Sequence, residues 1–205
     1  MLLHRLMVGQ RILTPSILVR VQVKQPVFKV AIKATFFVYI PLLNGEKMIG
    51  MTLNEDKYVT HPYNIFKHIE TYIRRLNWRI ANIECYSATT DYQFPFEDYD
   101  DYFIDGDTFF NLLKEHPEIQ WVWATISGFE KNISWEEIKK NPPIDISTEL
   151  TFWENGLHHL EPLSVFELIA FDSTETYVMI DDNNIAEKLI RNFPKAESLE
   201  KYVRK

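Results

Sequence analysis

Cysteine and glycine are scarce in this sequence. Among its 205 residues there are one cysteine, Cys85, and six glycines. A single thiol excludes an intrachain disulfide framework and any zinc site that needs several cysteines, and it fits a reducing compartment. With so few glycines the chain contains neither a G-x-G-x-x-G nor a Walker-type phosphate loop. The main nucleotide-binding signatures are therefore excluded.

Long hydrophobic runs are also absent. The longest uncharged run lies between Lys33 and Glu46 and is twelve residues long, whereas a membrane-spanning helix needs about 20. The apolar N-terminus is interrupted by Arg5 and Arg11, which breaks the apolar region of about 7 to 15 residues that a secretory signal requires. We therefore expect a cytoplasmic protein with no transmembrane segment.

Catalytic motifs are missing as well. The chain has no G-x-S-x-G elbow and no H-E-x-x-H zinc helix. Cys85 is a conceivable nucleophile with His61, His68 or His116, but a cysteine inside an apolar stretch is more typical of a small core residue. No catalytic residue and no cofactor is predicted.

Charge is unevenly distributed along the chain. Residues 1–47 hold seven Lys/Arg and one acid, and residues 48–205 hold 15 basic and 28 acidic groups. Such a contrast between segments indicates either an arm that binds nucleic acid or membrane, or a basic segment that pairs with its own acidic body. We place a domain boundary at 47/48.

The basic segment has the pattern of a β-hairpin. Apolar and polar residues alternate in "VRVQVK", residues 19–24, and in "FKVAIKATF", residues 28–36, with Pro26 between them. We predict a basic hairpin that extends the domain or joins its sheet. Its polar face has no aromatics on which bases could stack, which disfavours nucleic acid. An arm for nucleic acid or an anionic membrane stays as a third functional alternative.

Residues 48–205 alternate between the periods of strands and helices. The pattern predicts a single α+β domain in which a mixed, mostly antiparallel sheet packs against four to five short helices. Strands are expected at 48–53, 78–86, 119–129, 165–172 and 175–181, the last two as a hairpin. Helices are expected at 61–76, 107–116, 134–140, 184–193 and 196–203.

Local residue types predict where several helices begin. Asp107 or Thr108 is expected to be the N-cap of the helix that ends before Pro117. Ser134 and the glutamate three residues later form a capping box, and Asn184 is expected to begin the next helix in the same way. Helix capping is therefore a sufficient reason for these polar residues, and no binding or catalytic role is needed to explain them.

The densest functional candidate is "FPFEDYDDYFIDGDTFF", residues 94–110, with six carboxylates and seven aromatics. Its second half reads as a turn and a helix cap. The first half would steer association through its acids and supply rigid contact area through its rings. We therefore predict a non-enzymatic protein of immunity or inhibitor type that binds a partner with a basic surface. The predicted contact residues are Phe94, Phe96, Glu97, Asp98, Tyr99, Asp100, Asp101 and Tyr102.

The same acids leave a metal site open as an alternative. An EF-hand loop that starts at Asp98 or at Asp101 lacks the required oxygen ligands, so that pattern fails. A divalent-metal-dependent hydrolase stays as the second functional alternative. Adjacent histidines point apart on a strand and are more typical of a polar loop than of one ion site. The ligands of this alternative would be Glu97, Asp98, Asp100, Asp101, His158 and His159.

Three segments carry a resemblance to known proteins. They are "FIDGDTFFNLLKEHPEIQWVWATISGF", "FWENG" and "IAFDSTETYVMIDDNNIAEKLIRNFPKAESLEKY". In style and order they resemble small acidic proteins of Bacillus-type bacteria that are grouped as domains of unknown function. The resemblance covers about residues 48–205 and excludes the basic N-terminus. It implies a bacterial cytoplasmic accessory protein and brings no functional residues with it.

Overall fold

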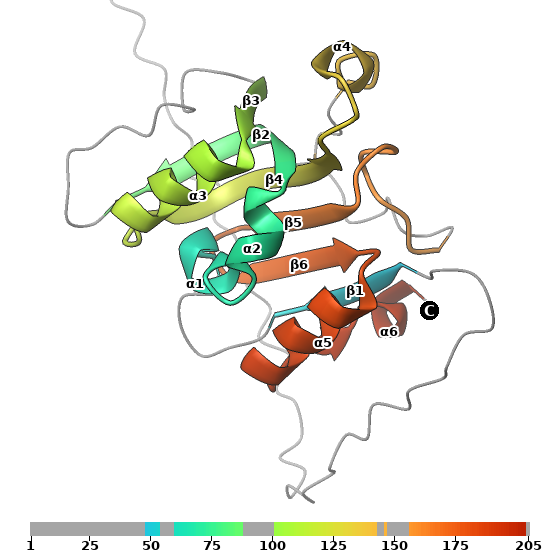
Figure 1. Cartoon of the computed structure of the whole chain (residues 1–205). Helices are drawn as coiled ribbons and strands as arrows, with labels where there is room; N and C mark the ends of the chain where they lie inside the picture. Colours follow the sequence, from blue (N-terminus) through green and yellow to red (C-terminus); the bar gives the residue numbers. More distant parts are fainter. Residues whose placement is uncertain (1–47, 54–59, 88–100, 143–145, 147–155, 204–205) are drawn as a thin grey trace, which may run out of the picture. The chain divides into compact units, whose positions relative to one another are not determined.

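Seven antiparallel strands form one sheet in the order β3-β2-β4-β5-β6-β1-β7 (Figure 1). The structure, a computed structural model, describes residues 48–53, 60–87, 101–142, 146 and 156–203, all within the compact unit Pro41–Lys205. The strands are β1 Ile49–Thr52, β2 Leu76–Tyr86, β3 Asp101–Asp105, β4 Gln120–Glu130, β5 Phe166–Phe171, β6 Glu175–Ile180 and β7 Glu197–Ser198. The predicted strands of the body are confirmed, and the domain is α+β.

Six short helices accompany the sheet in the described residues, and four of them cover one of its faces (Figure 1). They are α1 Pro62–Phe66, α2 Glu70–Arg74, α3 Gly106–Glu115, α4 Trp135–Ile138, α5 Asn183–Asn192 and α6 Glu200–Val203. Figure 1 shows α1, α2, α3 and α5 in front of the strands, while α4 stands apart beyond the end of β4. None of the helices in the described ranges is long and apolar enough to cross a membrane.

The main core lies between the sheet and these helices. At its centre the rings of Phe66, Trp78, Phe109 and Phe166 pack with centroid separations of 5.4 to 6.0 Å. Tilted and edge-on contacts of this kind add to the burial of large apolar surfaces. Two of these rings come from helices α1 and α3, and two come from strands β2 and β5. The cluster therefore joins the helix layer to the sheet.

The predicted helix at 61–76 is wrong as a single element. The chain forms α1, turns at His68 and resumes as α2, and Leu76 already belongs to β2. The apolar spacing misled because Ile65 and Ile73 are buried on either side of the break. The apolar spacing of residues 61–76 therefore reflects burial of both short helices against the sheet, and not one continuous helix.

Two predicted N-caps are also wrong. Asp105, not Asp107 or Thr108, caps α3 and accepts from both of their amides. Likewise Asp182 caps α5 one residue before the helix starts, in place of Asn184. Each aspartate lies at a junction between a strand and a helix, where its side chain can accept from the first unpaired amides of the helix. The Ser134 capping box of α4 is confirmed.

The C-terminal segment divides where one helix was predicted. Glu197 and Ser198 pair with Thr52 and Met51 as β7, and only then does α6 begin. The β5–β6 hairpin at "DST" is confirmed, and Asp172 and Ser173 hold it with left-handed φ values of 47° and 59°. The carbonyl of Ser173 accepts from two side chains, which fixes this turn to neighbouring elements.

The other face of the sheet carries a second, smaller core. Its buried members are Ile146, Leu160, Ile169, Tyr177, Met179 and Leu199. A group of buried charged and polar side chains lies on this same face, nearer to β2 and β3. Charges are seldom placed in such surroundings without a partner, so this group is the candidate site.

Candidate functional site: a buried ionic network on the second sheet face

Three polar residues stand in one row across adjacent strands. Arg79 of β2 is directly opposite Ser127 of β4, which is directly opposite Glu167 of β5. Their exposed fractions are 2%, 1% and 0%. Because side chains alternate along a strand, Trp78 and Ile80 enter the main core while Arg79 points to the second face. The row therefore places the opposite charges of Arg79 and Glu167 in buried positions on the second face of the sheet.

Arg79 binds three separate segments of the chain. Its Nε and Nη2 donate to the two carboxylate oxygens of Asp101 at 2.8 Å each. Its Nη1 donates to Glu161 Oε2 at 2.9 Å and to the carbonyl oxygen of Asn141 at 2.7 Å. A planar guanidinium is suited to such two-pronged pairing. One side chain thus connects β3, the chain after α4 and the loop before β5.

Glu167 organises the loop before β5. Its Oε2 accepts from the amide of Leu160 at 2.8 Å, and its Oε1 accepts from the amide of Glu161 at 2.6 Å. The Ser164 hydroxyl lies 3.0 Å from Oε1 and 2.9 Å from the carbonyl oxygen of Glu161, and its single proton serves one of them at a time. Buried backbone amides that no strand pairs are satisfied here by one carboxylate.

His159 extends the network to the end of β6. Its Nε2 lies 2.9 Å from Asp181 Oδ1, and its Nδ1 lies 3.6 Å from Glu167 Oε2. Burial alone would lower the pKa of His159, but the two carboxylates outweigh it and hold that pKa above its ordinary value. The imidazolium form is therefore favoured by a carboxylate on each side of the ring.

Glu161 is the most perturbed acid of the network. Burial raises its pKa to about 7, against the opposing effect of Arg79 and with further upward contributions from Glu167 and Asp101. Desolvation penalises the charged form of any carboxyl group. Glu161 therefore gains or loses a proton near neutral pH, and it does so beside Arg79 and Glu167, which are both buried.

Ser127 is the one member of the row with an unmet hydrogen bond. Within the described ranges its buried Oγ has no hydrogen-bond partner. Next to the row, Asn82 has a left-handed φ of 54° at a bulge in β2 and donates to Thr125 Oγ1 at 3.3 Å. Unpaired polar atoms and irregular strands often mark functional or strained places.

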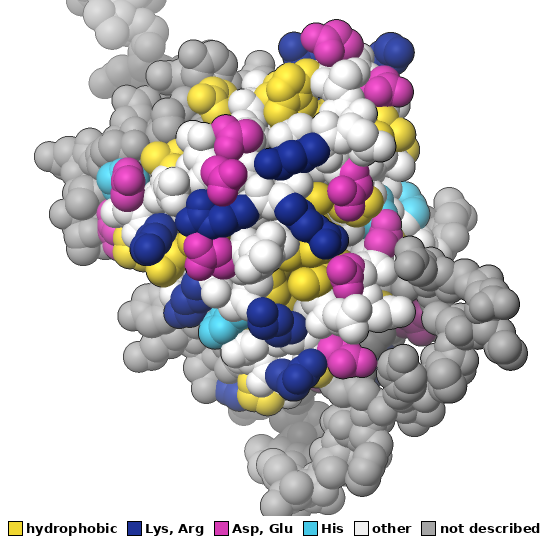
Figure 2. All heavy atoms as spheres, in the orientation of Figure 1, with side chains coloured by type: hydrophobic (Ala, Val, Ile, Leu, Met, Phe, Trp, Pro, Cys, Tyr) yellow, Lys and Arg dark blue, Asp and Glu magenta, His cyan; other side chains and the backbone are white. Residues whose placement is uncertain are grey.

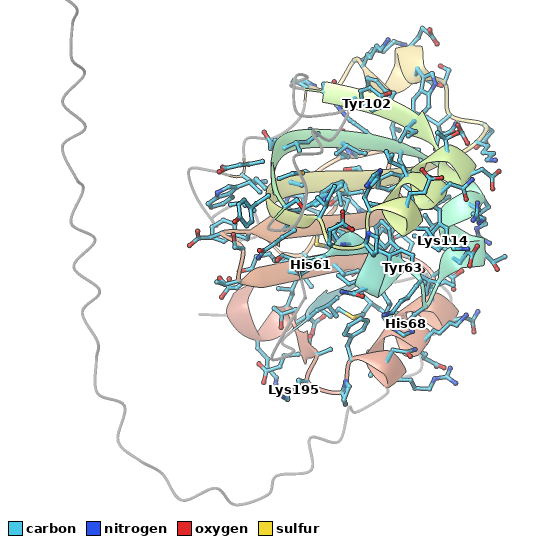
Figure 3. The ribbon with its side chains drawn as sticks, turned by 90° about the vertical axis from the view of Figure 1, so that its left-hand side faces the viewer. His61, Tyr63, His68, Tyr102, Lys114 and Lys195 are labelled. Carbon is cyan, nitrogen blue, oxygen red and sulfur yellow. The ribbon has the colours of Figure 1, made fainter. Side chains whose placement is uncertain are left out.

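Two of the eight predicted contact residues fall in the described chain. Asp101 and Tyr102 begin β3, the end strand of the sheet. Asp101 is bound by Arg79, and Tyr102 packs partly buried against the main core. Figure 3 shows Tyr102 at the β3 end of the sheet, far from Lys195 and His68. The other six, at positions 94 and 96–100, lie outside the described residues.

The described members of the metal alternative do not converge. His158 Nδ1 lies 2.9 Å from the carbonyl oxygen of Gly156, and the two ring nitrogens of His159 face different carboxylates. Among the residues that the structure covers, no three His, Cys, Asp or Glu form a group that could hold a metal ion. The alternative stays a prediction for residues 97, 98 and 100.

The sequence contains a signal for this network that no catalytic or binding motif captures. Arg79 in "NWRIA" and Glu167 in "VFELIAF" are single charges inside apolar strands. Opposite charges in two such strands indicate a buried pair, because an isolated charge in a core is costly. Glu161 has no comparable signal, since it lies in a polar stretch whose path across the sheet cannot be read from its sequence.

The network is suited to holding chain segments and a proton, not to turnover. A carboxyl group with a pKa near 7 has the right acidity for a general acid or base. However, the Glu161 side chain is only 3% exposed, and both carboxylate oxygens of Glu167 receive protein donors. A substrate cannot reach either carboxylate in this arrangement.

The described residues of the helix-covered face carry charges of both signs. Figure 2 shows Lys and Arg interspersed with Asp and Glu over this layer. Arg74 binds Glu70 and Asp107, and Arg75 binds Asp182. Largely exposed pairs of this kind contribute little to stability.

Comparisons with protein-family models, with curated proteins and with solved structures found no match. The resemblance to acidic proteins of Bacillus-type bacteria therefore stays a prediction.

Proposed function

We propose that the protein is a non-enzymatic binding protein of immunity or inhibitor type, which docks on a basic partner protein through residues 94–102. The observation that carries this proposal is the bidentate bond from Arg79 to Asp101, the last carboxylate of that segment. A segment whose end is fixed to a sheet loses less freedom when it binds. A cytoplasmic location belongs to the proposal.

The division of labour among the carboxylates supports docking. Asp101 is held by Arg79, and Glu161 and Glu167 bind inside the protein. Residues 97, 98 and 100 precede the anchored position directly in the sequence. We assign these three acids to electrostatic steering and Asp101 to anchoring. The rings at 94, 96 and 99 supply the contact area, since aromatic side chains bury much surface with little loss of freedom.

The test is capture of partners at low salt with two matched triple variants. The first neutralises the segment: Glu97→Gln, Asp98→Asn and Asp100→Asn. The second removes the same charge from exposed helix positions: Glu115→Gln, Glu136→Gln and Glu187→Gln. A basic protein retained by wild type and by the helix variant, but lost from the segment variant, supports the proposal. Equal retention by both variants, or no retained basic protein at all, refutes it.

Kinetics of the captured pair separate the two roles within the segment. Neutralising the acids should lower the association rate and flatten its dependence on salt, because steering acts before contact. Replacing Phe96 and Tyr99 by alanine should mainly raise the dissociation rate, because packed rings act after contact. The reverse pattern, in which the acids set dissociation and the rings set association, would contradict these two roles.

A further inference from the structure

The loop Leu157–Ser164 is attached to the second face of the sheet through its central residue, Leu160. Leu160 is buried in the second core, and its amide donates to Glu167 Oε2. The residues on either side of it, His159 and Glu161, both carry ionisable side chains that reach the network. The apolar anchor of the loop is therefore flanked by two proton-binding groups.

The charges that face these two groups come from four strands or strand ends. Glu161 faces Arg79 of β2, Asp101 of β3 and Glu167 of β5. His159 faces Glu167 and, after β6, Asp181. One guanidinium thus stands among four carboxylates, and each proton taken up by Glu161 or His159 reduces the excess of negative charge. The raised pKa of both groups is consistent with this arrangement.

The closed arrangement also contains an unmet polar contact. Ser127 lies between Arg79 and Glu167 in the row, and its hydroxyl has no hydrogen-bond partner in the part of the chain that is described. A buried polar group without a partner destabilises the state that contains it. His159 Nδ1, in the loop itself, is also buried without a hydrogen-bond partner among the described residues. The loop is therefore held by ionic contacts while two polar atoms of the network stay unpaired, and unpaired atoms of this kind lower the free energy that local opening requires.

We propose that this network is a proton-dependent latch, which holds the loop Leu157–Ser164 closed on the sheet while Glu161 is neutral and His159 is cationic, and loosens it when they lose those protons. Neutral Glu161 still accepts from Arg79 through one oxygen and gains a donor on the other. Ionised Glu161 brings another buried negative charge beside Glu167. Deprotonated His159 loses the positive charge that attracts the carboxylates of Asp181 and Glu167. The latch controls how often this loop opens, and the proposal does not depend on the docking function.

Hydrogen exchange at the amides of Leu160 and Glu161 tests the latch directly, because both donate to Glu167 in the closed state. Protection factors, corrected for the intrinsic effect of pH, are measured between pH 6 and 8. We expect wild type to lose about tenfold of this protection over that range. While the pH lies between the ordinary pKa of glutamate and the raised pKa of Glu161, each pH unit favours the open state by up to about tenfold. Amides in the centre of β4 and β5 should keep theirs, which shows that the opening is local.

Glu161→Gln imitates the neutral acid and should remove most of the pH dependence. Glu187→Gln, an exposed helix position, should keep the wild-type response. Flat protection in wild type, or the same slope in Glu161→Gln, overturns the proposal. If Glu161→Gln does not fold, a carbon NMR titration of the wild-type Glu161 carboxyl group decides: a midpoint near neutrality supports the latch, and a midpoint at the ordinary value for glutamate overturns it.

Discussion

Arg79 and Asp101 are joined by two hydrogen bonds of 2.8 Å, although they are not directly opposite each other in the sheet. Arg79 is opposite Phe103, and Asp101 is opposite Ala81. The guanidinium crosses this diagonal on the second face while it also binds Glu161. Edge strand β3 is therefore tied to the loop before β5 through a single side chain.

Arg79→Met should strongly destabilise the domain. The substitution keeps much of the side-chain volume but leaves Glu161 and Asp101 without their cation. Removing one partner of a buried ion pair typically costs about 3–5 kcal/mol, because the remaining charge stays uncompensated. Urea unfolding at pH 7.5 measures the change in the free energy of unfolding.

Arg191→Met is the matched control for this substitution. Arg191 pairs with Glu187 on the surface of α5, where its side chain is 73% exposed. Pairs of this kind contribute about 0.3–0.5 kcal/mol. Similar losses for the two methionine variants would show that the Arg79 network contributes no more than a surface pair.

Stability should decrease as the pH rises through neutrality, relative to a variant that cannot titrate at Glu161. The pKa of this group is about 7 in the folded protein and is raised from an ordinary value of 4.5. Between these two values the folded state binds more protons than the unfolded state. The stabilisation is therefore complete below the lower value and is lost as the pH rises through the upper one.

The measurement compares wild type with Glu161→Gln in urea at pH 5, 6, 7 and 8. The free energy of unfolding of wild type, minus that of Glu161→Gln, should fall by about 2 kcal/mol from pH 5 to pH 8. His159, whose pKa is also raised, acts in the same direction and remains in both proteins. A difference that stays constant with pH would mean that Glu161 titrates normally.

Ser127→Ala should stabilise the protein. The substitution removes a buried hydroxyl with no hydrogen-bond partner among the described residues, and such a group costs about 1–3 kcal/mol. We expect a gain of about 1 kcal/mol and a matching rise of the thermal midpoint. Ser164→Ala is the control and should destabilise, because that hydroxyl binds Glu167. A loss in both variants would show that Ser127 has a partner.

The sequence was sufficient for most elements of the sheet. Alternating and apolar runs placed β2, β4, β5 and β6, and the dipeptide Asp172–Ser173 marked their hairpin. These features depend on neighbouring residues alone. The Ser134 capping box was equally local, and it was correct for that reason.

The errors arose where distant segments decide the structure. The helix predicted at 61–76 breaks because both halves are buried against the sheet, and 197–198 becomes β7 because β1 offers it an open edge. The candidate site was missed for the same reason. Arg79, Glu161 and Asp101 are 22 to 82 positions apart, and only strand order and register bring them together.

Gly106→Ala should be the most disruptive small substitution at the start of α3. A Cβ at this position would lie 2.2 Å from the carbonyl oxygen of Ile73 and 2.6 Å from that of Leu76. Both are backbone atoms, so α2 or α3 would have to shift. Overpacking of this kind costs about 1–3 kcal/mol or more, and we expect the upper end of that range in urea unfolding.

Gly156→Ala separates this steric effect from backbone strain. Gly156 has a left-handed φ of +105°, but a Cβ there would meet no atom within 4 Å. Its substitution should cost about 1–2 kcal/mol through strain alone. If Gly106→Ala proves the milder of the two, then α2 and α3 yield without cost. In that case the close contact between them does not fix how β3 leads into α3.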